Sequence, residues 1–245
     1  MRISFIGIGS AWNIWENNTS AFIKKCNKMI LIDCGETIAR EIIKKDLLSD
    51  INDLYILISH THSDHVGSLG TLLFYSKYKK NIKNNIVLPD DIEFNTNFRE
   101  YLRLVYITSE VEYVNAETLI NEFDLTMFQF LRANHVKSIP CYCFVLQDSE
   151  NLIYYSADNN NLEYIKKYIR YPNAQIYTEI CDNPRLQEEH LLLEKLENAV
   201  EEGEKRKISL MHINETIEIE NLKKAGFNIP VVEEEKKKIW EKKLN

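Results

Sequence analysis

Cysteine is scarce in this sequence, and long apolar runs are missing. The five cysteines are odd in number and irregularly spaced, which argues against a paired disulfide framework and favours a reducing cytoplasm. No apolar run approaches the roughly 20 residues that are needed to cross a bilayer. Residues 1–10 lack the charged and then apolar layout of a secretory signal. We therefore expect a cytoplasmic protein that has no membrane partner.

An excess of positive charge is also missing. The formal net charge is −7 and the isoelectric point is about 5.5. A protein that grips long nucleic acid usually carries a basic patch, because neutralising phosphates and releasing their counterions supplies most of the affinity. The short lysine runs at 24–25 and 77–80 are typical of solvated faces. The composition therefore favours a small ligand over long nucleic acid.

The remaining composition is that of one globular α/β domain, which we expect to span residues 1–245. Hydrophobic residues make up 44% of the chain and charged residues 27%. Periodicity predicts strands near residues 2–7, 19–24, 29–32, 54–58, 85–88, 111–114, 125–131, 142–147, 152–156, 175–178 and 207–211. It predicts helices over 35–47, 67–78, 94–106, 160–169, 186–203 and 215–225. The charged tail, 232–245, is predicted to pack Trp240 on the body of the domain.

Histidine is rare as well, but its placement carries the strongest signal. Three of the six histidines lie within six residues, in the run His60-Thr61-His62-Ser63-Asp64-His65. His60 and His62 follow the apolar run 54–58, so at strand spacing they point the same way. Imidazole and carboxylate groups are the ligands preferred by Zn²⁺, Mn²⁺ and Fe²⁺. This motif therefore predicts a metal site at the end of a buried strand.

The same motif resembles that of the metallo-β-lactamase superfamily. Further similarity lies in the opening strand and glycine turn at 3–10, in strands at 18–23 and 29–32, and in the turn Asp33-Cys34-Gly35. The resemblance implies an αββα sandwich of two mixed sheets with helices outside. It also implies two divalent cations, Zn²⁺ or alternatively Mn²⁺, that share a water. The implied ligands are His60, His62 and His135 for one ion, Asp64, His65 and His212 for the other, and Asp158 bridging both.

Within the superfamily, the chain is most similar to the branch that contains ribonuclease Z and related phosphodiesterases. Members carry a second histidine about one helix before the last ligand, and His190 lies 22 positions before His212. Glu179 matches the glutamate that orients this histidine. The resemblance therefore implies that His190 protonates the leaving oxygen, with Asp64 and Glu179 as the other catalytic positions. A surface position on a helix is the alternative for His190.

Departures from that branch point to a small substrate. His135 and Asp158 are 23 positions apart, which leaves no room for the protruding arm that binds tRNA. An arginine that holds phosphate in the branch is also missing after His212, where the sequence is Ile213-Asn214-Glu215. The chain resembles the small armless members that hydrolyse cyclic mononucleotides, including the anti-Pycsar phosphodiesterases, which destroy cyclic CMP and cyclic UMP. An RNA 3′-processing endonuclease and a non-catalytic nucleotide-sequestering protein are the alternatives.

Base recognition by such an enzyme needs an aromatic or amide lid over the site. Tyr106 and Tyr113 lie in the segment before His135, and we expect one of them to supply that lid, in its own chain or across a homodimer interface. Core or rim positions are the alternative for both tyrosines. The expected partners are thus a cyclic nucleotide and a second copy of the chain.

Overall fold

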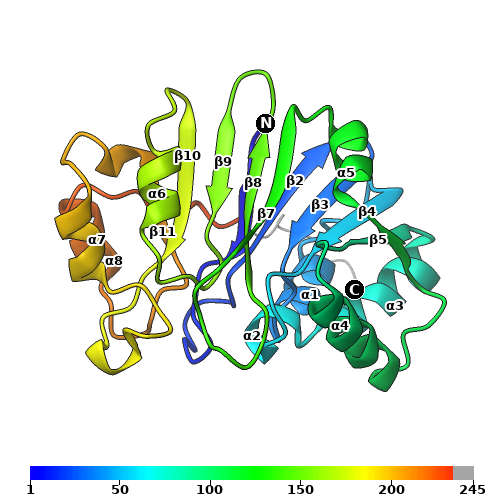
Figure 1. The fold of residues 1–245 in the computed structure, drawn as a ribbon. Helices are drawn as coiled ribbons and strands as arrows, with labels where there is room; N and C mark the ends of the chain where they lie inside the picture. Colours follow the sequence, from blue (N-terminus) through cyan, green and yellow to red (C-terminus); the bar gives the residue numbers. More distant parts are fainter. Residues whose placement is uncertain (234–245) are drawn as a thin grey trace, which may run out of the picture.

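The computed structural model describes residues 1–233, and two β-sheets form its centre (Figure 1). The first sheet holds six strands in the order of the chain: β1 (Ser4–Gly7), β2 (Ser20–Lys25), β3 (Lys28–Ile32), β4 (Asp53–Leu57), β5 (Lys83–Val87) and β6 (Glu112–Val114). The second has the order β11 (Ile208–Met211), β10 (Ala174–Glu179), β9 (Leu152–Tyr155), β8 (Tyr142–Gln147) and β7 (Met127–Arg132). All eleven predicted strands are present.

Each sheet is mixed in the same way. Strands β1 to β3 pair antiparallel, and β3 to β6 pair parallel. Strands β7 to β9 pair antiparallel, and β9 to β11 pair parallel. As a result, β7, β9, β10 and β11 all end at one edge of their sheet. Polar residues that follow these strands are therefore brought to the same place.

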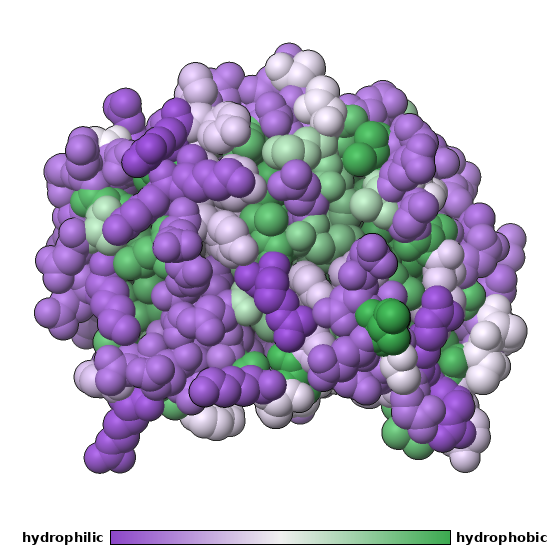
Figure 2. Space-filling view, in the orientation of Figure 1, coloured by the Kyte–Doolittle hydropathy of each residue, from purple (hydrophilic) through white to green (hydrophobic). Residues whose placement is uncertain are grey.

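The core lies between the two sheets. Phe5 of β1 contacts Tyr155 of β9 and Tyr177 of β10, with ring centroids 6.3 and 5.2 Å apart. Strand β3 is buried at four of its five positions and β9 at all four, as expected for strands that are covered on both faces. Figure 2 shows green, hydrophobic side chains over β7 and the neighbouring strands, with purple, hydrophilic ones around them. Burial of the inner faces thus holds the sheets together.

Helices cover the outer faces of the sandwich (Figure 1). They are α1 (Ile38–Lys44), α2 (Ser63–Val66), α3 (Leu69–Phe74), α4 (Ile92–Leu104), α5 (Ala116–Phe123), α6 (Glu163–Tyr168), α7 (Leu193–Ala199) and α8 (Ile219–Lys224). A π-helical turn at Tyr75–Lys79 extends α3, and short 3₁₀ turns lie at Pro184–Leu186 and Lys205–Lys207. Within residues 1–233, no helix is both long and apolar enough to cross a bilayer.

The helices depart from the sequence predictions at two places. The single helix predicted over 186–203 is wrong. The backbone N–H of Cys181 donates to the carbonyl of Leu191, and its carbonyl accepts the N–H of Leu193, so residues 191–192 stay extended and α7 begins only at Leu193. Helix α5 was missed, although Asn115 caps it by accepting the Thr118 backbone N–H at 3.0 Å. The tail prediction at Trp240 falls in 234–245, outside the described residues.

Candidate metal centre

The predicted metal ligands follow different strands and meet at one edge of the sandwich. His60 and His62 lie beyond β4, Asp64 and His65 on α2, His135 beyond β7, Asp158 beyond β9 and His212 beyond β11. Three groups of possible ligand atoms form there, each with its atoms within 4.8 Å of one another, and two of these groups together contain the predicted ligands. One group is His60, His62 and His135, and the other is Asp64, His65, Asp158 and His212. The structure therefore brings all seven predicted ligands together.

The first group consists of three imidazoles whose nitrogens converge. His62 Nδ1 lies 2.9 Å from His60 Nε2 and 3.3 Å from His135 Nε2. The opposite nitrogen of His135 donates its proton to the carbonyl of Glu189 at 2.8 Å, which leaves the Nε2 lone pair facing the group. A tetrahedral Zn²⁺ with bonds of 2.0–2.1 Å would separate its ligand nitrogens by about 3.3 Å. The spacing of these nitrogens fits a cation between them.

The second group alternates imidazoles with carboxylates. His65 Nε2 lies 3.3 Å from Asp64 Oδ2 and 3.2 Å from Asp158 Oδ1. His212 Nε2 lies 3.2 Å from the same Asp64 oxygen. Both His65 Nε2 and Asp158 Oδ1 are buried and have no hydrogen-bond partner among the described residues. Buried polar atoms without a well-aligned hydrogen bond cost free energy, and a shared cation would satisfy both.

Asp158 lies between the two groups, as a bridging ligand must. Its Oδ1 faces the second group, while its Oδ2 lies 4.0 Å from His60 Nε2 and 3.8 Å from His135 Nε2. Burial alone would raise the pKa of Asp158, but the His212 and His65 imidazoles hold it well below its usual range. The carboxyl group is therefore ionised and available to cations on both sides.

Asp33, which was not assigned a role from the sequence, orients one of these ligands. Asp33, at the end of β3, accepts the Nδ1–H of His65 at 2.9 Å. It also accepts the backbone N–H of Ser59 at 2.7 Å and the Ser59 hydroxyl at 2.8 Å. A histidine ligand is commonly held in this way by a carboxylate on its other nitrogen. The Asp-x-Gly turn after a buried strand was the available signal, but it does not reveal the contact.

Local backbone geometry places several of these groups. Asp33, Ala157 and His212 all have positive φ values, of 60°, 47° and 54°, at the ends of their strands. Left-handed backbone at non-glycine residues is uncommon and gathers at functional sites. Gly35 serves a different purpose, because a Cβ there would lie 1.9 Å from the carbonyl oxygen of Asp64. Only glycine lets α2 approach β3 closely enough to place Asp64.

His190 and Glu179 form a pair beside the second group. His190 Nδ1 lies 2.5 Å from Glu179 Oε2 and 3.8 Å from Asp158 Oδ2. His190 precedes α7 and is only 18% exposed, so the alternative of a helix-surface residue is wrong. Burial disfavours its charged form, but the Glu179 carboxylate outweighs this effect and raises the pKa of His190 to about 9. The imidazole therefore carries a proton near neutral pH.

A cavity of about 780 Å³ opens over these residues. His62, Asp64, His135, Asp158, His190 and His212 line it, together with residues of the β1–β2 loop and of the segments after β10 and β11. Pockets for small ligands typically measure about 300–1,000 Å³. The site is thus concave, of ligand size, and equipped with acidic and imidazole groups at its base.

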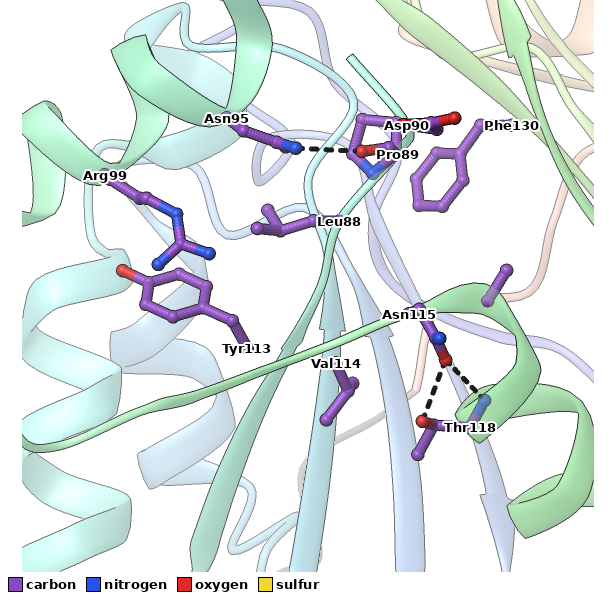
Figure 3. A pocket seen from close by; sticks show the side chains of 11 residues that line it. Leu88, Pro89, Asp90, Asn95, Arg99, Tyr113, Val114, Asn115, Thr118 and Phe130 are labelled. Atoms are coloured by element: carbon purple, nitrogen blue, oxygen red, sulfur yellow. Dashed lines mark hydrogen bonds between the residues drawn. The ribbon is translucent and has the colours of Figure 1, made fainter. Parts of the chain in front are cut away.

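Neither tyrosine that was proposed as a lid lines this cavity within the described chain. Tyr113 lies on β6 under the Arg99 guanidinium, whose carbon is 3.6 Å from the ring centroid (Figure 3). That pair borders a separate cavity of about 730 Å³, whose lining also includes Leu88 and Phe130. Tyr106 is 83% exposed near the end of α4. A lid role for either tyrosine across a dimer interface stays a prediction.

Known proteins resemble this chain over most of its length. A family model described as Anti-Pycsar protein Apyc1 matches residues 1–237. The chain belongs to the Apyc1 family. The Apyc1 protein of Paenibacillus harenae is 26% identical over 229 residues, which cover 89% of this chain and 92% of that protein. The Apyc1 protein of Bacillus phage 010DV004 is 24% identical over 255 residues, covering 93% and 94%.

Solved structures establish the fold of this Apyc1 family member. The metallo-β-lactamase fold protein YhfI of Bacillus subtilis superposes with a TM-score of 0.68 at 15% identity, over 93% of this chain and 94% of that one. The short form of human tRNase Z gives 0.62 at 16% identity, over 87% and 93%. Zn²⁺-bound PqqB of Methylobacterium extorquens gives 0.64 at 12% identity, over 94% and 97%. The predicted αββα metallo-β-lactamase fold is confirmed.

Proposed function

We propose that this protein is a metal-dependent phosphodiesterase that hydrolyses 3′,5′-cyclic mononucleotides to mononucleotides. The observation that carries the proposal is the convergence of six ligand groups around Asp158, with the His190–Glu179 pair beside them. The curated relatives are named for action against Pycsar, and one solved neighbour is a diphosphatase of the PhnP family. Both are consistent with phosphate-ester chemistry in this cavity.

The donor set suits two divalent cations. Imidazole and carboxylate groups without thiolates favour Zn²⁺ or Mn²⁺. When bound, the two cations would neutralise charge on the phosphoryl oxygens and lower the pKa of a shared water from about 15.7 toward about 7. His60, His62 and His135 would hold one cation, Asp64, His65 and His212 the other, and Asp158 both.

His190 completes the chemistry by delivering a proton. Its Nδ1–H is held by Glu179, which is fully buried, so the ring is fixed and its Nε2 proton is free for transfer. Hydrolysis adds water across the bond between phosphorus and the ribose 3′ oxygen, and that oxygen must gain a proton as it departs. A positioned proton donor accelerates such a step about 10²- to 10⁴-fold. Glu179 is thus a positioning residue for His190.

Leaving-group chemistry tests this assignment. His190→Ala should slow hydrolysis of a cyclic nucleotide about 10²- to 10⁴-fold while metal content stays unchanged. Bis-p-nitrophenyl phosphate should be affected far less, because p-nitrophenolate is a stable anion and leaves without a proton. Gln187→Ala, at an exposed position three residues before His190, is the control. Equal loss on both substrates would show that His190 does not protonate the leaving group.

A substrate panel separates the proposal from its alternatives. The purified protein is assayed with cyclic CMP, UMP, AMP and GMP and with a tRNA precursor, in added Zn²⁺ or Mn²⁺ and in EDTA. We expect turnover of cyclic nucleotides that EDTA abolishes. Cleavage of the precursor alone would favour the RNA endonuclease. Between His135 and Asp158, where that branch carries its RNA-binding arm, the connections before β8 and between β8 and β9 are only 136–141 and 148–151. Nucleotide binding without turnover would favour a sequestering protein.

A homodimer is a further proposal. Phe74, Tyr78, Leu104 and Tyr106 are all more than a third exposed, and Phe74 stacks on Tyr78 at 6.0 Å. Burying such side chains against a second copy would be favourable. Analytical ultracentrifugation should show a dimer that Tyr106→Asp weakens. A monomer at micromolar concentration would remove both the dimer and a tyrosine lid supplied in trans.

A further inference from the structure

One aromatic side chain at the mouth of the metal-site cavity has no role in the mechanism so far. Trp12 lies in the loop between β1 and β2 and lines the same cavity as His62, Asp64 and His190. It is nevertheless 76% exposed. Among the described residues, no other ring and no cationic side chain is paired with its indole. A large apolar surface is therefore left open to solvent beside the ligand groups.

The loop that carries Trp12 is held in place by specific hydrogen bonds. The Asn13 side-chain amide donates to the carbonyl of Ile213 at 2.8 Å, and its oxygen accepts the backbone N–H groups of Trp15 and Glu16. The backbone N–H of Ser10 also donates to Ile213, at 3.1 Å. Ile213 directly follows the ligand His212. Trp12 is therefore kept at a set position relative to the metal ligands.

The cavity thus has two chemically different parts. Its histidines and aspartates suit a phosphate group with cations, whereas Trp12, Pro184 and Leu186 offer apolar surface. A cyclic nucleotide divides in the same way, into a charged phosphate ring and a flat nucleobase. Aromatic side chains bind bases by stacking on their faces, largely without regard to which base it is. We propose that Trp12 is the residue on which the nucleobase of the substrate stacks.

This inference rests on the proposed function, and its main rival is a protein interface. Ile14 and Trp15, in the same loop, are both 80% exposed and do not line the cavity. If the loop served only to bind a second copy, Trp12 and Trp15 would be equally important. If Trp12 stacks on the base, replacing Trp12 should weaken binding of the cyclic nucleotide and replacing Trp15 should not. Trp15→Ala is therefore a matched control of the same size and exposure.

The test compares substrates with and without a base. Trp12→Ala, Trp12→Phe and Trp15→Ala are assayed with cyclic CMP and with methyl riboside 3′,5′-cyclic phosphate, which has a methoxy group in place of the base. Trp12→Ala should raise KM for cyclic CMP about 5- to 150-fold, the effect of losing one base–aromatic stack. The kcat of Trp12→Ala should stay within about twofold of the unaltered enzyme, because the lost stacking stabilises the bound substrate and the transition state equally. Trp12→Phe should restore most of the affinity.

Each result supports or overturns stacking of the nucleobase on Trp12. A KM increase for cyclic CMP that is absent for the riboside and absent in Trp15→Ala supports stacking. An equal rise in KM for cyclic CMP and for the riboside would overturn stacking on Trp12. So would an equal rise in KM in Trp12→Ala and Trp15→Ala that is accompanied by a smaller sedimentation coefficient. If the unaltered enzyme turns over the riboside and no cyclic nucleotide, the proposed function fails together with the inference. If cyclic CMP is hydrolysed equally well by Trp12→Ala, the inference alone fails.

Discussion

Replacing Asp33 by asparagine should weaken metal binding without removing a metal ligand. Asp33 is fully buried and accepts three hydrogen bonds, from the Ser59 N–H, the Ser59 hydroxyl and His65 Nδ1. If the asparagine oxygen keeps the Ser59 backbone N–H, its NH₂ group faces His65 Nδ1. Two donors then oppose each other unless the histidine proton moves to Nε2. That nitrogen is the one whose lone pair faces Asp64 and Asp158.

The expected size of the effect follows from this single contact. Loss of a partner on the outer nitrogen of a metal-binding histidine costs about 10- to 100-fold in metal affinity or activity. That corresponds to about 1.4–2.7 kcal/mol. The shape of the side chain and one of three hydrogen bonds are retained, so the free energy of unfolding of the metal-free protein should fall by only about 1–3 kcal/mol. The variant should therefore fold and still bind metal weakly.

Competition with a chromophoric chelator measures the Zn²⁺ affinity of Asp33→Asn, and urea unfolding measures its stability. Asp50→Asn is the control, because Asp50 is exposed and, within residues 1–233, accepts a hydrogen bond only from the neighbouring Ser49 hydroxyl. An unchanged affinity in a folded Asp33→Asn protein would refute the idea that Asp33 sets the His65 tautomer.

Three further outcomes are expected. Asp158→Ala should lose metal and activity together, by more than the roughly 100-fold cost of an outer partner, and elemental analysis checks the metal. Gly35→Ala should destabilise the protein by about 3 kcal/mol or more in urea unfolding, because its Cβ meets the Asp64 carbonyl, whereas Gly203→Ala, with open space around it, should not. Asp91→Ala should cost about 0.5–2 kcal/mol at pH 7 through loss of the α4 cap. The Tyr142 hydroxyl, the Phe94 N–H and Arg132 lower the pKa of Asp91, so its stabilisation is present above about pH 3.9 and is lost as the pH falls further. Urea midpoints of the unaltered and Asp91→Ala proteins should thus converge in acid.

The strands could be predicted well because their periodicity and their turns are local. Buried runs such as 29–32 and 54–57 lie between polar breaks, and these patterns need no knowledge of partners. The helices were harder. The run after Pro184 has helical composition, but the backbone pairing of Cys181 with residues 191–193 delays α7. A long-range contact thus overrides a local preference.

In the site, too, some residues could be found from local sequence and others depend on contacts between distant segments. His60, His62, Asp64 and His65 could be found because four ligands close together in the chain form a readable motif. His135, Asp158 and His212 are isolated in the sequence and were assigned only through a family resemblance. Asp33 contacts His65, 32 residues away, and the loop of Trp12 is held by hydrogen bonds from Ser10 and Asn13 to Ile213. No local pattern reveals either contact.

The sequence by itself determined the positions of the strands along the chain, the nature of the ligands and the small, acidic character of the protein. It did so because apolar periodicity, donor chemistry and net charge are properties of the residues themselves. Tertiary structure alone decided that Asp33 orients His65 and that Trp12 borders the cavity. Those features depend on distances of a few ångströms between strands that are far apart in the chain, and only packing of the two sheets sets such distances.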